Sequence, residues 1–175
     1  MTIQEIEQHI RAVPDFPKPG ILFRDITPLL GQAGARKAVL DRLVEAYKDQ
    51  KIDAIAGIES RGFLFGMTLA DALGVPFVPI RKAGKLPYDK IKYDYELEYG
   101  TATLEIHTDA VKAGDRVLIH DDLLATGGTG AAGAELLAQL GAELAGFSFI
   151  IGLNFLGGDE VLKKYSDQIH CLIEY

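Results

Sequence analysis

The stretch VLIHDDLLATGGTG, residues 117–130, decides the predicted fold of this chain. Its apolar start predicts a buried strand, its two aspartates an acidic turn, and its small residues the beginning of a helix. Ligands of an open parallel sheet bind beyond the carboxyl ends of the strands, where Asp121 and Asp122 are expected. The stretch therefore predicts a site for a phosphorylated sugar.

The two halves of that stretch suit two parts of such a ligand. Carboxylates at Asp121 and Asp122 can accept hydrogen bonds from neighbouring ribose hydroxyls. A helix that begins just after them offers free N–H groups to an anion, and small residues let the backbone come close to it. The residues expected around the phosphate are Ala125, Thr126, Gly127, Gly128 and Thr129.

Other interpretations of the same residues are weaker. An acidic turn before an ordinary helix cap is the simplest of them. Gly128, Gly130 and Gly133 match the dinucleotide pattern G-x-G-x-x-G, but DDLLAT separates them from the strand, and no acidic residue ends the next one. A Walker loop would need a lysine after the glycines. His120 beside Asp121 suggests a metal ligand, although no other histidine has suitable spacing.

The rest of the chain repeats an alternation of helices and strands. Buried strands are expected at residues 52–58, 75–80, 117–119 and 145–151, and helices at residues 38–47, 63–73 and 130–140. This order predicts an α/β fold with a parallel, doubly wound sheet in one domain, residues 1–175.

Two segments depart from the alternation. Ile3, Ile6, Ile10 and Val13 predict a short amphipathic helix, after which prolines predict an irregular arm. Residues 81–100 show no regular pattern, which predicts a structureless lid. Beyond them, residues 102–107 alternate apolar and polar side chains, as a half-exposed strand would.

Composition limits the possible partners. The 175 residues are 48% hydrophobic and carry a net charge of −7, which disfavours binding to nucleic acid. Neither a leader pattern nor an apolar run of membrane-spanning length is present in the sequence, and Cys171 is the only cysteine. A cytoplasmic protein with no membrane partner is expected.

Residues 117–129 resemble the signature of the type I phosphoribosyltransferases, which is an apolar strand, two acidic residues and a T-G-G-T loop. His120 stands where that family usually has an aliphatic residue. Four other segments resemble its adenine-specific members: FPKPGILFRDITPLL from Phe16, ESRGFLFG from Glu59, VPIRKAGKLP from Val78 and YELEYGTATLEIH from Tyr95. The resemblance implies a parallel sheet core flanked by helices, an N-terminal hood over residues 1–34, and a flexible flap at about residues 82–100.

The resemblance also implies a reaction. The phosphoribosyl group of phosphoribosyl pyrophosphate would pass to adenine, giving AMP and pyrophosphate. Magnesium would be bound mainly through the donor and water, with no direct protein ligand, and the protein would be a homodimer. Base recognition is assigned by resemblance to Phe23, Arg24 and Asp25, and catalysis to Glu98 as acid/base, with Tyr99 closing the site.

Stabilising a pyrophosphate leaving group requires cations and N–H donors, and Arg61, Arg81, Lys82 and Lys85 lie near predicted strand ends or in the flap. The resemblance implies a pyrophosphate loop at Glu59, Ser60 and Arg61, with a cis Glu59–Ser60 peptide.

Several alternatives stay open on the sequence alone. The basic residues could be solvated surface, Phe23 a core residue, and Glu98 a surface charge. The base could be hypoxanthine, guanine or xanthine. A regulator that binds the donor without turnover is a further alternative, although such proteins usually carry a DNA-binding domain and lose catalytic residues.

Overall fold

The computed structural model describes residues 1–96 and 100–175. Its main sheet has the strand order β5-β6-β4-β3-β7-β8-β9, and β1 and β2 form a separate two-stranded sheet. The strands are β1 Arg11–Pro14, β2 Leu22–Asp25, β3 Ala54–Ile58, β4 Phe77–Lys82, β5 Lys90–Glu96, β6 Thr101–His107, β7 Arg116–Leu124, β8 Glu143–Gly152 and β9 Ile169–Glu174. The helices are α1 Ile3–Glu7, α2 Thr27–Gly31, α3 Ala33–Tyr47, α4 Gly62–Leu73, α5 Gly128–Gln139 and α6 Gly158–Leu162, with a 3₁₀ turn, η1, at Asn154–Leu156.

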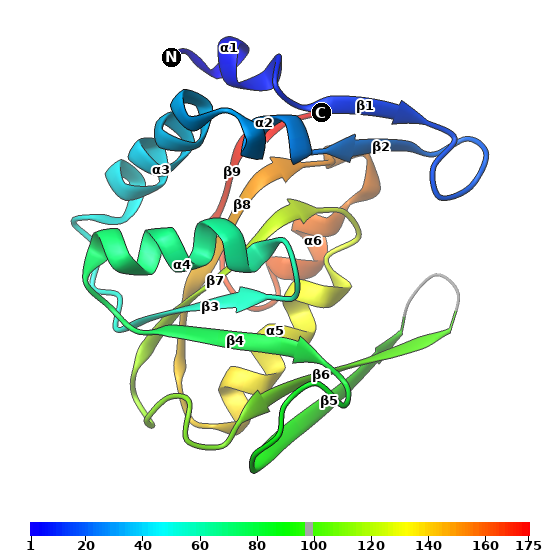
Figure 1. Ribbon diagram of the computed structural model, residues 1–175. Helices are drawn as coiled ribbons and strands as arrows, with labels where there is room; N and C mark the ends of the chain where they lie inside the picture. Colours follow the sequence, from blue (N-terminus) through cyan, green and yellow to red (C-terminus); the bar gives the residue numbers. More distant parts are fainter. Residues whose placement is uncertain (97–99) are drawn as a thin grey trace.

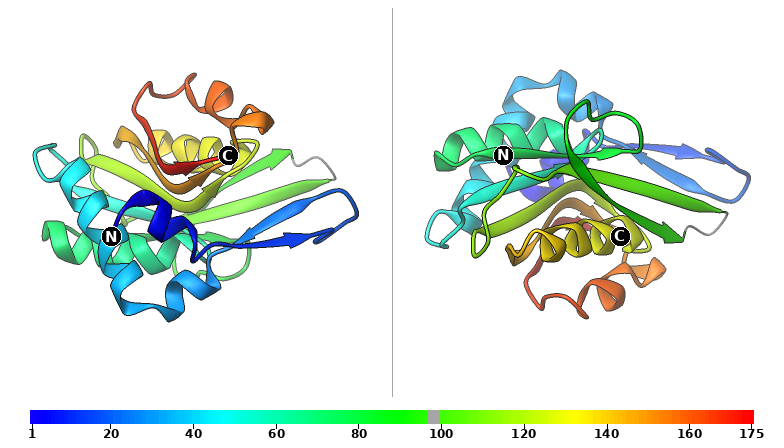
Figure 2. Two further views of the ribbon diagram at one scale, coloured as in Figure 1. Left: turned by 90° about the horizontal axis from the view of Figure 1, so that it is seen from above. Right: turned by 90° about the horizontal axis from the view of Figure 1, so that it is seen from below.

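The predicted parallel sheet is confirmed for the five strands from β4 to β9 in the sheet order. Strands β6 and β5 extend this sheet on the β4 side, and both pair antiparallel with their neighbours. Figure 2 shows α3 and α4 on one face of the sheet and α5 and α6 on the other. Because both faces are covered, β3 is buried along its whole length, as its apolar run predicts. None of the helices in the described part of the chain has the length and apolar character needed to cross a membrane.

The N-terminal helix is shorter than the spacing of its isoleucines predicts. Helix α1 begins with a capping box of Thr2 and Glu5, and it ends at Glu7. Val13 instead lies in β1, opposite Phe23 of β2. A proline disfavours helical backbone at the residue before it, and Val13 precedes Pro14. The predicted irregular arm is therefore confirmed only for residues 15–21, which join β1 and β2 into a β-hairpin.

The predicted structureless interval from residue 81 to residue 100 is also wrong over much of its described length. Lys90–Glu96 forms β5, which pairs with β6 from Lys90↔His107 to Glu96↔Thr101. In β6, Glu105 is 1% exposed rather than solvent-facing, and its Oε2 accepts a hydrogen bond from Gly84 N at 3.1 Å. Figure 1 shows that the β5–β6 pair and the β1–β2 hairpin extend from the same side of the molecule.

Strand β7 continues past the predicted acidic turn to Leu124. Its pairing with β3 ends at Gly57↔His120, while its pairing with β8 runs on to Leu124↔Gly152. Asp121 and Asp122 are thus inside a strand, but beyond the last residue that pairs with β3. The acidic pair consequently sits at the carboxyl edge of β3, which is the position that parallel sheets use for ligands.

Candidate active site

Two adjoining cavities lie at this edge of the sheet. The larger has a volume of about 750 Å³ and the smaller about 200 Å³, and both are lined by Arg61, Asp121, Asp122 and Thr129. The larger one is also lined by Glu59, Ser60, Lys82, Ala83, Tyr95, Ala102, Thr103 and Leu104. The smaller one is also lined by Leu123, Leu124, Ala125, Thr126, Gly127, Gly130 and Phe149. The predicted acidic pair, phosphate loop and pyrophosphate loop therefore come together in one place.

Burial and the neighbouring Arg61 have opposite effects on the pKa values of the acidic pair. Asp122 is 3% exposed, and its Oδ2 lies 2.7 Å from Nε of Arg61. Burial raises the pKa of Asp121 well above its usual range, and the Asp122 charge raises it further. Burial also raises the pKa of Asp122, although Arg61 opposes that rise. Ligand hydroxyls could donate hydrogen bonds to these carboxylates and so offset part of the cost of burying them.

The phosphate loop has the backbone that its sequence predicts. Gly127 has φ +82°, and a Cβ there would lie 2.5 Å from the carbonyl oxygen of Gly158, so no other residue fits without a shift. The first α5 hydrogen bond runs from Ala131 N to Gly127 O. The N–H groups of residues 128–130 therefore precede the helical ladder and are available to an anion.

The glycines of the dinucleotide pattern serve a different purpose. A Cβ on Gly130 would lie 3.0 Å from Leu162 of α6, and one on Gly133 would lie 3.2 Å from Ile119 of β7. Both glycines thus allow α5 to pack closely on its neighbours.

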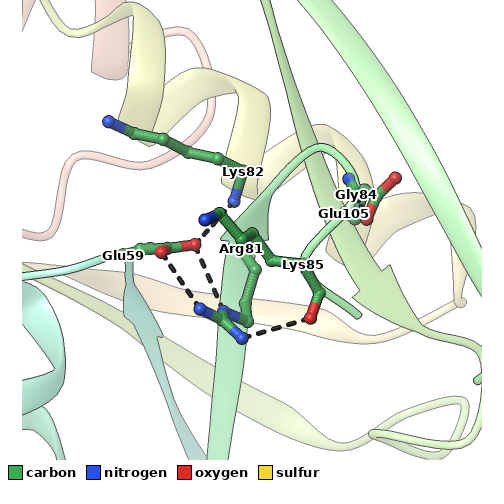
Figure 3. Close-up of polar contacts among 6 residues, drawn as sticks. All are labelled: Glu59, Arg81, Lys82, Gly84, Lys85 and Glu105. Carbon is green, nitrogen blue, oxygen red and sulfur yellow. Dashed lines mark hydrogen bonds and ion pairs between the residues drawn. The ribbon is translucent and has the colours of Figure 1, made fainter. Parts of the chain in front are cut away.

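Figure 3 shows the polar contacts that join Glu59 to Arg81 and Lys82. The Arg81 guanidinium donates to both carboxylate oxygens of Glu59, at 3.2 and 3.1 Å, and to the carbonyl oxygen of Lys85 at 3.2 Å. Lys82 N also donates to Glu59, at 3.0 Å. Among the described residues that line the larger cavity, Lys82 is present, whereas Arg81 and Lys85 are not. Arg81 therefore fixes Glu59, and the Glu59–Ser60 peptide is cis, as the resemblance implies.

The three predicted base-site residues of β2 differ in what their side chains do. The Arg24 guanidinium lies 3.6 Å from the centroid of the Tyr175 ring. Hydrogen bonds from the Thr27 hydroxyl and from Thr27 N, the latter at 2.8 Å, lower the pKa of Asp25. The ring of Phe23 lies near Arg61 of the cavity lining, with the guanidinium 5.1 Å from the ring centroid. The side chains of Arg24 and Asp25 are thus engaged within the protein.

Glu98 and Tyr99 lie outside the described residues, so the structure places neither of them. The larger cavity is also lined by Tyr95, an aromatic residue that sequence reasoning missed. The signal was available, because Ile91, Tyr93 and Tyr95 alternate with charged residues as a strand requires.

His120 is a buried structural histidine. It is fully buried, and its Nδ1 lies 3.1 Å from Oγ of Ser148 on the neighbouring strand β8. Burial lowers the pKa of His120 to about 4, so the imidazole is neutral at physiological pH. Within residues 1–96 and 100–175, no group of three or more side chains that could hold a metal ion occurs.

This histidine should make the fold sensitive to acid. A base whose pKa is lowered on folding binds fewer protons in the folded state, so stability falls as the pH drops from 6.5 toward 4. At pH 4.5 the loss from His120 should be about 2–3 kcal/mol relative to pH 7. Urea denaturation at both pH values should show a smaller loss for His120→Val, and an unchanged loss for the control His9→Val. An equal loss in all three proteins would contradict the assignment.

Comparison with known proteins agrees with this geometry. A model of the phosphoribosyl transferase domain matches residues 30–172. The adenine phosphoribosyltransferase of Flavobacterium johnsoniae is 55% identical over 161 residues, which cover 92% of this chain and 95% of the relative. The solved structure of adenine phosphoribosyltransferase from Thermoanaerobacter pseudethanolicus superposes with a TM-score of 0.96, at 52% identity over 99% of this chain and 100% of that one.

The enzyme from Saccharomyces cerevisiae, solved with adenine and an imino-altritol bisphosphate, gives a TM-score of 0.90 at 46% identity, covering 97% of each chain. With a sheet of this topology and an acidic pair beside a phosphate loop, the chain belongs to the phosphoribosyltransferase family. Within that family it belongs to the adenine phosphoribosyltransferases, which are pentosyltransferases.

Proposed function

We propose that this chain transfers the phosphoribosyl group of phosphoribosyl pyrophosphate to adenine, producing AMP and pyrophosphate in purine salvage. One observation carries the proposal: the acidic pair, the phosphate loop and the Glu59–Arg61 segment line two adjoining cavities. Relatives that share about half of the sequence over nearly the whole chain are named adenine phosphoribosyltransferase. The described chain and residues 97–99 are proposed to act as a single domain.

The smaller cavity suits the ribose 5-phosphate part of the donor. Residues 125–129 surround the phosphate in this proposal, with backbone N–H groups and the Thr126 and Thr129 hydroxyls as donors. Asp121 and Asp122 accept hydrogen bonds from the two ribose hydroxyls. Both carboxylates line both cavities, so the ribose would lie at their junction.

The larger cavity suits the pyrophosphate. Arg61 and Lys82 supply positive charge there, and the backbone of Ser60 adds polar groups. As the bond from ribose to pyrophosphate breaks, negative charge builds on the leaving group, and fixed cations stabilise it.

Magnesium fits this arrangement as a donor-bound ion. Mg²⁺ prefers oxygen ligands and usually combines substrate phosphates and water with one or two carboxylates. In this proposal Asp121 and Asp122 bind the ribose, and Glu59 is engaged with Arg81. The ion would therefore be bound mainly by oxygens of the donor and by water. When bound, the ion would neutralise part of the pyrophosphate charge.

The base would enter from the β1–β2 side. Phe23 offers an aromatic face to a purine, and the main chain of Arg24 and Asp25 offers donors and acceptors to its edge. Glu98 is proposed to exchange a proton with the purine as the glycosidic bond forms, and Tyr99 to help close the site. Excluding water at that moment would protect the donor from hydrolysis.

The decisive experiment supplies the purified protein with magnesium, phosphoribosyl pyrophosphate and one purine base at a time. AMP formation from adenine, with little nucleotide from hypoxanthine, guanine or xanthine, is the expected result. Donor binding without AMP formation would favour the regulatory alternative instead.

Glu98→Gln should lower kcat by about a hundredfold or more, because general acid–base catalysis typically contributes that much. The KM for phosphoribosyl pyrophosphate should change little, since the amide keeps the size of the side chain. Steady-state kinetics with Glu96→Gln as the neighbouring control would test this. A turnover number unchanged from wild type would remove Glu98 from the catalytic residues.

The family resemblance also supports a homodimer in the cytoplasm. Sedimentation equilibrium should give twice the mass of the chain at micromolar concentration, and a monomer there would exclude the proposed assembly.

A further inference from the structure

Tyr95 connects the β5–β6 pair to the phosphate loop. Its hydroxyl oxygen lies 3.3 Å from Oγ1 of Thr129, in the first turn of α5. Its ring lies beside Gly128, where a Cβ would be 3.6 Å from Cδ2 of the tyrosine. Both Tyr95 and Thr129 line the larger cavity. A side chain from an edge strand thus contacts the residues that surround the proposed 5′-phosphate.

A bound phosphate would determine which of the two hydroxyls donates the hydrogen bond between Tyr95 and Thr129. A threonine hydroxyl has one proton and two lone pairs, whereas a phosphate offers only acceptors near neutral pH. Thr129 must therefore donate its proton to the phosphate, which leaves its oxygen to accept from Tyr95. Hydrogen bonds in such a chain polarise one another, so the Tyr95 proton strengthens the bond from Thr129 to the phosphate.

We propose that Tyr95 is a positioning residue for the 5′-phosphate, acting through the Thr129 hydroxyl. The inference rests on the proposed function, because it takes residues 125–129 as the phosphate loop. Tyr95 holds the Thr129 hydroxyl in the orientation that donates to the ligand. It also links phosphate binding to the placement of β5, the strand that leads directly into residues 97–99.

The neighbouring Tyr93 provides a matched control. It lies two residues earlier in β5 on the same face of the strand, and its ring packs against the core on the α5 side. Tyr93→Phe also removes a tyrosine hydroxyl from β5, but at a position outside both cavities. Any general effect of tyrosine-to-phenylalanine replacement on β5 should appear equally in this variant.

The experiment measures dissociation constants for AMP and for pyrophosphate by calorimetry. The proteins are wild type, Tyr95→Phe, Thr129→Val, the double variant and Tyr93→Phe. Tyr95→Phe should weaken AMP binding roughly three- to tenfold, the usual effect of losing one hydrogen bond. It should weaken pyrophosphate binding less, because the phenylalanine ring still lines the larger cavity. Adding Tyr95→Phe to Thr129→Val should cause no further loss, because the hydroxyl through which Tyr95 acts is already absent. Tyr93→Phe should bind both ligands like wild type.

The outcomes separate the two hypotheses. A wild type that fails to bind AMP would overturn the proposed function and this inference with it. A wild type that binds AMP, with Tyr95→Phe binding it equally well, would overturn this inference alone. The inference would also be overturned if Tyr95→Phe weakened AMP binding equally in wild type and in Thr129→Val. An equal loss of AMP and pyrophosphate affinity would overturn it as well, since both results indicate a general structural effect.

Discussion

Replacing Asp121 and Asp122 together by asparagine should lower kcat/KM for phosphoribosyl pyrophosphate by about a thousandfold. Each carboxylate is proposed to accept a hydrogen bond from a ribose hydroxyl, and such charge-assisted bonds contribute about 1.5–3 kcal/mol each. The amides keep the shape of the side chains but lose the charge. Initial-rate kinetics at varied donor concentration would measure the effect, and an unchanged KM for the donor would exclude the ribose role.

The same double variant should be more stable than wild type at neutral pH. Burial raises the pKa of Asp121 and of Asp122 on folding, so the folded state binds more protons than the unfolded chain above about pH 4. Stability is therefore lost as the pH rises through these raised pKa values, and the amides remove that loss. Thermal melts at pH 7 should show this gain, while Asp109→Asn, an exposed control, should alter neither stability nor kinetics.

Arg61→Gln should lower kcat/KM for the donor by about 10²–10³-fold, for two reasons. A cation beside the proposed pyrophosphate is lost, and so is the ion pair of 2.7 Å with Asp122. Without the guanidinium, the pKa of Asp122 should rise further, because Arg61 is what opposes its rise. Donor affinity should therefore become more pH-dependent than in wild type.

Measuring the donor KM from pH 6 to pH 8 tests this second effect. In Arg61→Gln the KM should increase toward pH 6 more steeply than in wild type, as Asp122 becomes protonated and stops accepting from the ribose. Arg42→Gln on α3, whose guanidinium contacts the carbonyl oxygen of Met1, is the control and should match wild type. Parallel pH profiles in Arg61→Gln and wild type would contradict the role assigned to the ion pair.

Sequence reasoning correctly placed the acidic pair beside the start of α5, because both lie in one local stretch. Residues 117–130 carry a strand, an acidic pair and a helix start in one continuous stretch, and the structure keeps them together. What local reasoning missed was the length of β7. The strand continues through Asp121 and Asp122 because β8 still pairs with it, and a partner strand from elsewhere in the chain leaves no mark on the local sequence.

The cations show the same limit. Arg81, Lys82 and Lys85 look equivalent in sequence, yet successive residues of a strand point to opposite faces. Lys82 faces the cavity, whereas Arg81 binds Glu59. Which of two adjacent cations meets the ligand depends on the register of β4 against its neighbours, a long-range property. Strand β5 was different, because its alternating pattern was present and was overlooked.

The base-side residues belong to a sheet that shares no backbone pairing with the main one. The Phe23 ring lies near the Arg61 guanidinium, while the side chains of Arg24 and Asp25 contact Tyr175 and Thr27. In the proposed function, recognition of the base and binding of the donor therefore involve residues of two separate sheets. If these roles hold, substitutions within the short β1–β2 hairpin should alter which purine is accepted more than they alter the affinity for the donor.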